Sequence, residues 1–337
     1  MMYKKDSNQI FIAWNKFQRR AFSMQDYFNY NLIFRGNTFK NRRFRIIDYM
    51  HKSFYTIVLL LFKRPKVLWT QLPPTPLIFI AKIYKKINPK VFIIADCHNA
   101  VFSKKWEKYI QNYDKLNSFD LILVHNHVIK EIALKKGILE KKIAILETRP
   151  ATTNNHISSL KKKQNHAKIL MPCGFSEDEP LATVFAAAQL IDEIQIIITG
   201  PVERADEIHD LSYIPDNVKI TGYLSKEDYE KLFFECDAVL GLTTEDHIQL
   251  SVANEATGFE KPMIISDTKL LRELFYKGAV FVETLNPHSI AEGIKSAIVM
   301  NAQLEQEVKF LKAERIQKWN NQAEKIHNII SNSYEEE

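Results

Sequence analysis

Short apolar runs rich in Ile, Val, Leu and Phe recur along the chain and are separated by longer stretches of mixed polarity. Continuous apolar runs of about 4–8 residues are typical of strands that are buried on both faces of a parallel sheet. Two sets of such runs are therefore predicted as strands: residues 10–14, 30–34, 66–71, 90–99, 120–126 and 142–147, then residues 169–173, 194–200, 218–224, 238–243, 262–267 and 279–283.

Segments with helical periodicity fill the gaps between these predicted strands. Residues 43–62 and 127–137 have this pattern, and the second segment ends at Gly137, a residue type that favours the turn closing a helix. Residues 302–331 form a long helical pattern containing Trp319. Alternating strands and helices in both halves predict an α/β fold of two doubly wound, Rossmann-like domains.

The segment 152–168 is polar, basic and without hydrophobic period, and is the predicted linker. We expect a first domain of residues 1–165, a second domain of residues 166–310 and a C-terminal helix of residues 311–337. The 337 residues suit two domains of about 100–200 residues each.

Charge divides unevenly between the two halves. Residues 1–165 hold 31 basic against 10 acidic side chains, a net charge of +21, whereas residues 166–337 hold 15 against 30, a net charge of −15. The basic half favours an anionic partner, such as a membrane leaflet, a lipid phosphate or a nucleic acid, although its basic runs could also be solvated faces. No nucleic-acid-binding motif is recognisable, so a nucleic-acid partner is disfavoured.

The three cysteines are far apart and lack metal-ligand spacing, which favours a reduced, intracellular chain. No secretory signal is visible. The longest apolar run, "FYTIVLLLF" at 54–62, is shorter than the roughly 18 residues that span a bilayer, and we expect it in a buried or interfacial helix. We therefore expect a cytoplasmic protein, for which docking at the inner face of the cell membrane remains open.

The stretch that follows residues 238–243 places polar side chains at the carboxyl end of a predicted strand, the edge where open α/β sheets bind ligands. A helix is expected to begin near Ile248 or Gln249, and its unpaired first-turn amides could hold a diphosphate. Glu255, farther along, could accept hydrogen bonds from two ribose hydroxyls. The alternative is that Glu245 and Asp246 cap a helix whose Glu255 faces solvent.

An ordered set of motifs surrounds this stretch: "GYL", "LSKEDYEKL", "CDAVLGL", "NEATG", "KPMIISD" and "GAVFVE". The order resembles the C-terminal donor domain of GT-B glycosyltransferases, specifically the family 4-like group (glycosyl transferases group 1), over residues 169–298. The resemblance implies two Rossmann-like domains with a cleft between them, and a C-terminal helix that crosses back to the first domain. It also implies a nucleotide diphosphate sugar as co-substrate, with no metal and no other cofactor.

The family carries two glutamates separated by seven residues in this loop and helix. The second falls on Glu255, where the resemblance implies ribose contact, and the first falls on His247, a departure. His247 could still bind donor sugar hydroxyls and is taken as a catalytic candidate. The other donor-binding candidates here, three of them through backbone amides, are Thr244, Ile248, Gln249 and Leu250.

A second departure lies after the first strand of this domain, where the family usually has an Arg and a Lys that neutralise the diphosphate. This chain reads "MPCGFSEDEPLATVF" there, without a cation. Gly174 and Ser176 are donor-binding candidates through their backbone and hydroxyl groups. The three acidic residues Glu177, Asp178 and Glu179 would repel an anion unless they cap the next helix.

In the basic half, Asp96 and His98 follow a predicted strand. His98 resembles a family histidine that reaches the donor sugar from the acceptor domain, and either residue could accept a proton in an inverting enzyme. The alternative is a capping aspartate beside a loop histidine. The "HNH" at 125–127 lacks further ligands at suitable spacing, so no metal site is expected.

The expected function is transfer of a sugar from a nucleotide diphosphate sugar to a hydroxyl of a glycan or lipid-linked acceptor, in bacterial surface polysaccharide synthesis. Retention or inversion of the anomeric configuration stays open. The alternative is a non-catalytic nucleotide-sugar-binding or scaffold protein of the same fold, because the missing cation pair permits the loss of chemistry.

Overall fold

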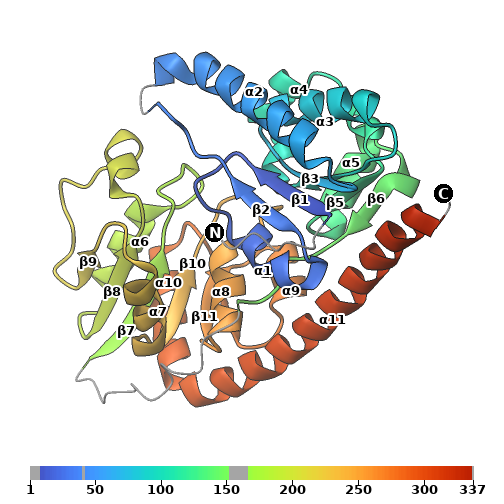
Figure 1. The fold of residues 1–337 in the computed structure, drawn as a ribbon. Coiled ribbons are helices and arrows are strands. Elements are labelled where there is room, and N and C mark those ends of the chain that lie inside the picture. The colour runs from blue at the N-terminus through green and yellow to red at the C-terminus, as the bar shows by residue number, and fades with distance from the viewer. Residues whose placement is uncertain (1–7, 40–41, 152–165, 336–337) are drawn as a thin grey trace. The chain divides into compact units, whose positions relative to one another are not determined.

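The computed structural model describes residues 8–39, 42–151 and 166–335. The chain divides into two compact units: unit 1 contains the residues up to Arg149 and those from Lys318 onward, and unit 2 runs from Pro150 to Gln317. Each unit contains one six-stranded sheet whose paired strands are all parallel (Figure 1). The predicted α/β fold is therefore confirmed.

The predicted domain boundary at residue 165 and most of the predicted linker 152–168 lie outside the described residues. Within the linker, only residues 166–168 are described, and Ala167 and Lys168 belong to a strand.

The sheet of unit 1 has the strand order β2-β1-β3-β4-β5-β6. Its strands are β1 (Gln9–Ala13), β2 (Asn31–Phe34), β3 (Val67–Leu72), β4 (Phe92–Cys97), β5 (Leu121–Val124) and β6 (Ile143–Ile145). Its helices are α1 (Arg19–Phe28), α2 (Arg45–Lys63), α3 (Pro76–Ile87), α4 (Lys104–Ile110) and α5 (His127–Lys135).

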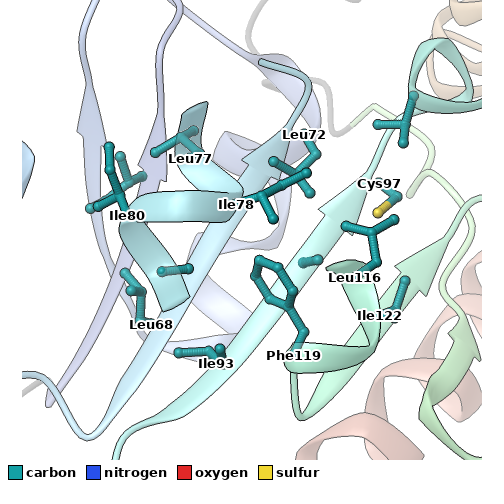
Figure 2. Packing of buried hydrophobic residues seen from close by; sticks show 14 of the residues in the cluster. Leu68, Leu72, Leu77, Ile78, Ile80, Ile93, Cys97, Leu116, Phe119 and Ile122 are labelled. Atoms are coloured by element: carbon teal, nitrogen blue, oxygen red, sulfur yellow. The ribbon is translucent and has the colours of Figure 1, made fainter. Parts of the chain in front are cut away.

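Both faces of this sheet are buried, which explains why its strands read as continuous apolar runs. Successive residues of a strand point to opposite faces: Leu68 belongs to one hydrophobic cluster, and its neighbours Val67 and Trp69 belong to another. Figure 2 shows the first cluster, in which Leu68 of β3 lies toward Ile80 of α3, and Ile93 of β4 lies toward Leu68 and Phe119.

The sheet of unit 2 has the strand order β12-β11-β10-β7-β8-β9. Its strands are β7 (Ala167–Pro172), β8 (Ile194–Thr199), β9 (Val218–Ile220), β10 (Ala238–Gly241), β11 (Met263–Ser266) and β12 (Ala279–Val282). Its helices are α6 (Leu181–Ala188), α7 (Lys226–Glu235), α8 (Ser251–Gly258), α9 (Lys269–Leu274) and α10 (Pro287–Val299).

The long C-terminal pattern forms one continuous helix, α11 (Asn301–Glu335). The division between the units falls within this helix, after Gln317. Beyond that point Trp319, Ala323 and Ile326 pack into the second cluster of unit 1, against strand residues such as Trp69. The C-terminal part of α11 is therefore a structural component of unit 1.

Several helices begin and end where local side-chain chemistry dictates. Asn126, Ser225 and Asn286 precede α5, α7 and α10, and their side chains accept hydrogen bonds from first-turn amides. Helix α5 ends at Lys135, and Gly137 adopts a φ of +87°, as its predicted role at the helix end requires. In the described part of the chain, no helix is both long and apolar enough to cross a bilayer.

Candidate functional site

In unit 2, strand connections change direction at β7. The chain leaves β7 toward β8 and β9 on one side, then returns to β10 on the other side. Ligands of open α/β sheets bind at the carboxyl ends of the strands beside such a switch point. The loops after β7 and β10 flank this point, and they contain the donor-binding residues that the sequence predicts.

The loop after β7 wraps around the carboxylate of Glu179. The Gly174 amide donates to Glu179 Oε1 at 3.0 Å, while the Ser176 amide and hydroxyl both donate to Oε2 at 2.9 Å. Gly174 and Ser176 thus present three converging donors, a pattern suited to an anion. In this structure the bound anion is the protein's own carboxylate, so Glu179 acts as a cap for the loop.

The loop after β10 is tied to the loop after β7 through Asp178. Thr243 donates from Oγ1 to the Asp178 carboxylate at 2.7 Å, and the Thr244 amide donates to the Asp178 backbone carbonyl at 2.9 Å. The Thr243 amide also donates to Ser266 Oγ at 2.9 Å, which connects this loop to the end of β11. Asp178 therefore points away from Glu179's donors and fixes both loops at the switch point.

The next helix begins two to three residues later than predicted, which is less than one turn. Helix α8 begins at Ser251, and Leu250 is its N-cap with an extended backbone. The Ile248 amide instead donates to the Glu245 carbonyl in a turn, and the Gln249 side chain folds forward onto Asn254 Oδ1 at 3.3 Å. Leu250 is buried.

The shift in the helix start changes which amides are available to a ligand. The first four amides of an α-helix, counted from its N-cap, have no acceptor within the helix. They belong here to Leu250, Ser251, Val252 and Ala253, whereas Ile248 and Gln249 precede the helix. Gly241 allows this turn to approach β10, since a Cβ at Gly241 would lie 2.4 Å from Val252 Cγ1.

His247 precedes the start of α8 in the chain, and Glu255 lies within the helix. His247 is partly exposed, and its Nδ1 lies 3.6 Å from a Glu245 carboxylate oxygen. Glu255 is half-buried and accepts a hydrogen bond at Oε2 from the Tyr229 hydroxyl of α7. Tyr229 belongs to the "EDYEKL" pattern, but no local signal assigns it a role, because its partner is 26 residues away.

In unit 1, the carboxyl ends of neighbouring strands bring together a buried polar cluster. Asp96, at the end of β4, is fully buried, and its two oxygens lie 3.1 and 3.3 Å from Nε of Arg20. Arg20 also donates to the carbonyls of Leu146 and Glu147, each at 2.8 Å. The Asp96 carboxylate is therefore held by a buried cation, and we regard it as a positioning group rather than the free base predicted as one option.

His98 lies at the centre of this edge. Its Nε2 is 2.6 Å from the amide nitrogen of Gln71 and 3.1 Å from that of Gln18, and its ring centroid is 4.7 Å from that of His125. Among the described residues, the buried atoms Gln71 Oε1 and His125 Nε2 have no hydrogen-bond partner. Buried polar atoms are rarely left unpaired, so this edge has unused capacity to bind a polar ligand.

Both histidines are held neutral. Desolvation lowers the pKa of His98 from 6.5 to about 4, despite the opposing negative charge of Asp96. Desolvation also lowers the pKa of His125 well below 6.5, assisted by the positive charge of Arg20. A neutral imidazole at neutral pH can accept a proton, as a general base must.

We expect the free energy of unfolding to decrease as the pH falls from 6.5 toward about 4. The folded-state pKa values of His98 and His125 are lowered, so the unfolded state binds more protons in this window, and the stability that these groups contribute is complete only above pH 6.5. Urea titrations across this range would measure the slope. The His125→Gln variant should have a shallower slope, and an unchanged slope would contradict the assignment of its pKa.

Asp96, His98 and His125 also offer ligand atoms within 4.8 Å of one another, as a metal ion would require. The fit is poor, because the Arg20 guanidinium already occupies the Asp96 carboxylate and a cation there would face its charge at close range. The absence of a metal from the reaction remains a prediction.

Several of these functional candidates have no signal in the local sequence. Arg20, Gln18 and Gln71 join the His98 cluster through sheet topology, 27 to 80 residues from their partners. Gln71 is the last residue of the strand predicted at 66–71, but nothing in that pattern assigns it a role.

The fold is shared with solved glycosyltransferase structures. HepE of Anabaena, in complex with UDP and glucose, has a TM-score of 0.69 at 12% identity, covering 96% of this chain and 99% of that chain. A glycosyltransferase of Rickettsia africae has a TM-score of 0.63 at 14% identity, covering 97% and 90%. Sucrose-phosphate synthase of Thermosynechococcus elongatus has a TM-score of 0.65 at 11% identity, covering 90% and 84%.

These likenesses establish a GT-B fold, that of two Rossmann-like units each built on a parallel six-stranded sheet. No curated protein sequence is significantly similar to this chain. The family described as glycosyl transferases group 1 matches residues 153–325, which is more than half of the chain. The chain belongs to this family, as the motif order predicted.

Proposed function

We propose that this protein transfers a sugar from a nucleotide diphosphate sugar to a hydroxyl of a glycan or lipid-linked acceptor, in bacterial surface polysaccharide synthesis at the cytoplasmic face of the membrane. Unit 2 would bind the donor and basic unit 1 the acceptor. The observation that carries this proposal is the pair of loops at the switch point of unit 2, with converging amide donors in one loop and the first turn of α8 after the other. Both features suit a diphosphate.

In the proposed reaction, the acceptor oxygen forms a bond to the anomeric carbon, and the bond from that carbon to the diphosphate oxygen breaks. The hydroxyl proton passes to a base, for which neutral His98 is our candidate. The amides of Ser251, Val252 and Ala253 would stabilise the charge on the departing nucleoside diphosphate. Glu255 would hold the ribose, with Tyr229 orienting its carboxylate.

A non-catalytic nucleotide-sugar-binding protein is the second candidate, because a carboxylate occupies the loop after β7 where the family has two cations. Calorimetry with UDP- and GDP-sugars, combined with an assay for donor hydrolysis and for transfer to a panel of acceptors, would separate the two. Binding with turnover supports the enzyme. Binding without turnover supports the second candidate, and the absence of binding contradicts both.

We expect the Glu179→Ala variant to bind UDP about tenfold more tightly than the wild type, equivalent to about 1.4 kcal/mol. Removal of the carboxylate frees the three donors of Gly174 and Ser176 and removes a negative charge that a phosphate would have to displace. Glu177→Ala is the matched control, since it removes the same charge from an exposed position of the same loop. Equal effects of both variants would indicate a general charge effect instead of a specific anion site.

A further inference from the structure

Helix α2 of unit 1 has its polarity reversed with respect to an ordinary surface helix. The residues it buries most completely are Asp48, Lys52, Thr56 and Leu60, a stripe at four-residue spacing of which three are polar. Apart from His51, the exposed positions from 46 to 62 are apolar, and we call these apolar positions the outer face of α2: Ile46 74% exposed, Ile47 52%, Met50 67%, Phe54 71%, Leu61 42% and Phe62 84%. A helix that covers a sheet normally turns its apolar stripe inward.

Specific contacts hold this helix with its apolar side out. Lys52 Nζ lies 2.7 Å from Asp48 Oδ2 and donates to Asn37 Oδ1 at 2.8 Å, while the Thr38 amide donates to Asp48 Oδ1 at 2.8 Å. One turn further on, the Thr56 hydroxyl accepts a hydrogen bond from a buried tryptophan at 3.2 Å. Rotating the helix to bury its apolar face would break the hydrogen bonds to Asn37, Thr38 and Trp14, because these partners lie outside α2.

The neighbouring helix α3 also has exposed apolar side chains. Helix α3, which packs beside α2, exposes Phe79 to 49%, Ile83 to 45% and Ile87 to 54% (Figure 1). Large exposed apolar areas on a protein surface commonly mark an interaction site.

Charge around this surface identifies the kind of partner. Residues 27–95 contain thirteen Lys and Arg but a single acidic residue, Asp48, which is buried against Lys52. Exposed basic residues lie at both ends of α2, with Arg43 and Arg45 at its start and Lys63 and Arg64 at its end. A partner that covers the outer face must therefore offer apolar groups to its apolar side chains and negative charge to the basic residues around them. A second copy of this chain would bring the same positive charge against it.

We propose that the outer face of α2 inserts into the surface of an anionic phospholipid bilayer, with the helix lying in the plane of the interface. Such a helix buries its apolar side chains at the boundary of headgroups and acyl chains while basic residues bind anionic headgroups. This inference specifies the membrane partner of the proposed function and does not depend on the transfer chemistry itself.

The test is co-sedimentation of the whole protein with vesicles of phosphatidylcholine alone or mixed with phosphatidylglycerol. The wild type should bind the mixed vesicles, more weakly at high salt, and bind neutral vesicles at least about tenfold less tightly. The Met50→Glu/Phe54→Glu variant should lower the partition coefficient on mixed vesicles by at least about tenfold, since it places charge in the apolar layer. Both substitutions lie at exposed positions, and circular dichroism checks that the fold is kept.

The matched control is Tyr223→Glu/Val299→Glu, which adds the same charge at two apolar positions of unit 2 that are 82% and 85% exposed, and it should bind vesicles as the wild type does. Binding to mixed vesicles that is equal for the wild type and the α2 variant would overturn the proposal. So would a dimer that the α2 variant abolishes, in the absence of vesicle binding.

Donor binding distinguishes this proposal from the proposed function. The α2 variant should bind UDP-sugars as the wild type does. If the wild type binds the donor but not the vesicles, only the membrane proposal is wrong. If it binds the vesicles but not the donor, only the proposed enzymatic function is wrong.

Discussion

The His98→Ala variant is expected to transfer sugar about 10²–10⁴-fold more slowly than the wild type, with a much smaller change in its affinity for the donor. The side chain is neutral at neutral pH because burial lowers its pKa to about 4. It is positioned by Gln18 and Gln71, beside a buried Arg20–Asp96 ion pair. A positioned neutral imidazole can take the acceptor proton as the new glycosidic bond forms.

Steady-state kinetics should separate kcat from KM in this variant, and calorimetry should measure donor binding directly. His127→Ala is the matched control, because it removes an exposed histidine of the same unit. A fall in donor affinity as large as the fall in kcat would make His98 a binding residue. Unchanged kcat would remove it from the reaction.

Replacing Glu255 with alanine should weaken the binding of nucleotide sugars by about 1–3 kcal/mol, which is roughly 5–150-fold. The half-buried carboxylate accepts a hydrogen bond from Tyr229, and we propose that it also accepts from the ribose hydroxyls. The loss leaves the ribose hydroxyls without an acceptor. Calorimetry of UDP and GDP with the variant would measure this effect.

Two further variants show whether the effect is specific. Tyr229→Phe removes the supporting hydroxyl and keeps the carboxylate, so it should weaken donor binding less than Glu255→Ala. Glu292→Ala removes an exposed carboxylate of α10 and should leave donor binding unchanged. If Glu255→Ala lowers only the stability of the protein and not its nucleotide affinity, Glu255 serves the fold alone.

The strands of both sheets could be predicted from the sequence because burial on two faces leaves a strong local pattern. β3 is buried at all six positions, and a run such as "KVLWTQ" shows this directly. Helix ends with a capping side chain, such as Asn126 before α5, were also readable. The start of α8 was not, since its N-cap is Leu250, a buried residue that makes no capping side-chain hydrogen bond.

Contacts between distant residues lie beyond local patterns. Arg20 and Asp96 are 76 residues apart, and the basic residue at position 20 looks like any other in a basic half until the sheet brings the pair together. The same holds for α2: its periodicity predicts an amphipathic helix, but the pattern does not tell which side faces the sheet. The hydrogen bonds of Asp48 with Thr38 and of Lys52 with Asn37, both outside the helix, hold this side inward, and they form only in the folded chain.

A crystal structure of the protein with a bound UDP- or GDP-sugar tests the central claim most directly. We predict phosphate oxygens within hydrogen-bonding distance of the amides of Ser251, Val252 and Ala253, with ribose hydroxyls at the carboxylate of Glu255. A nucleotide bound away from the carboxyl ends of β7 and β10, with the first turn of α8 left uncontacted, would contradict it.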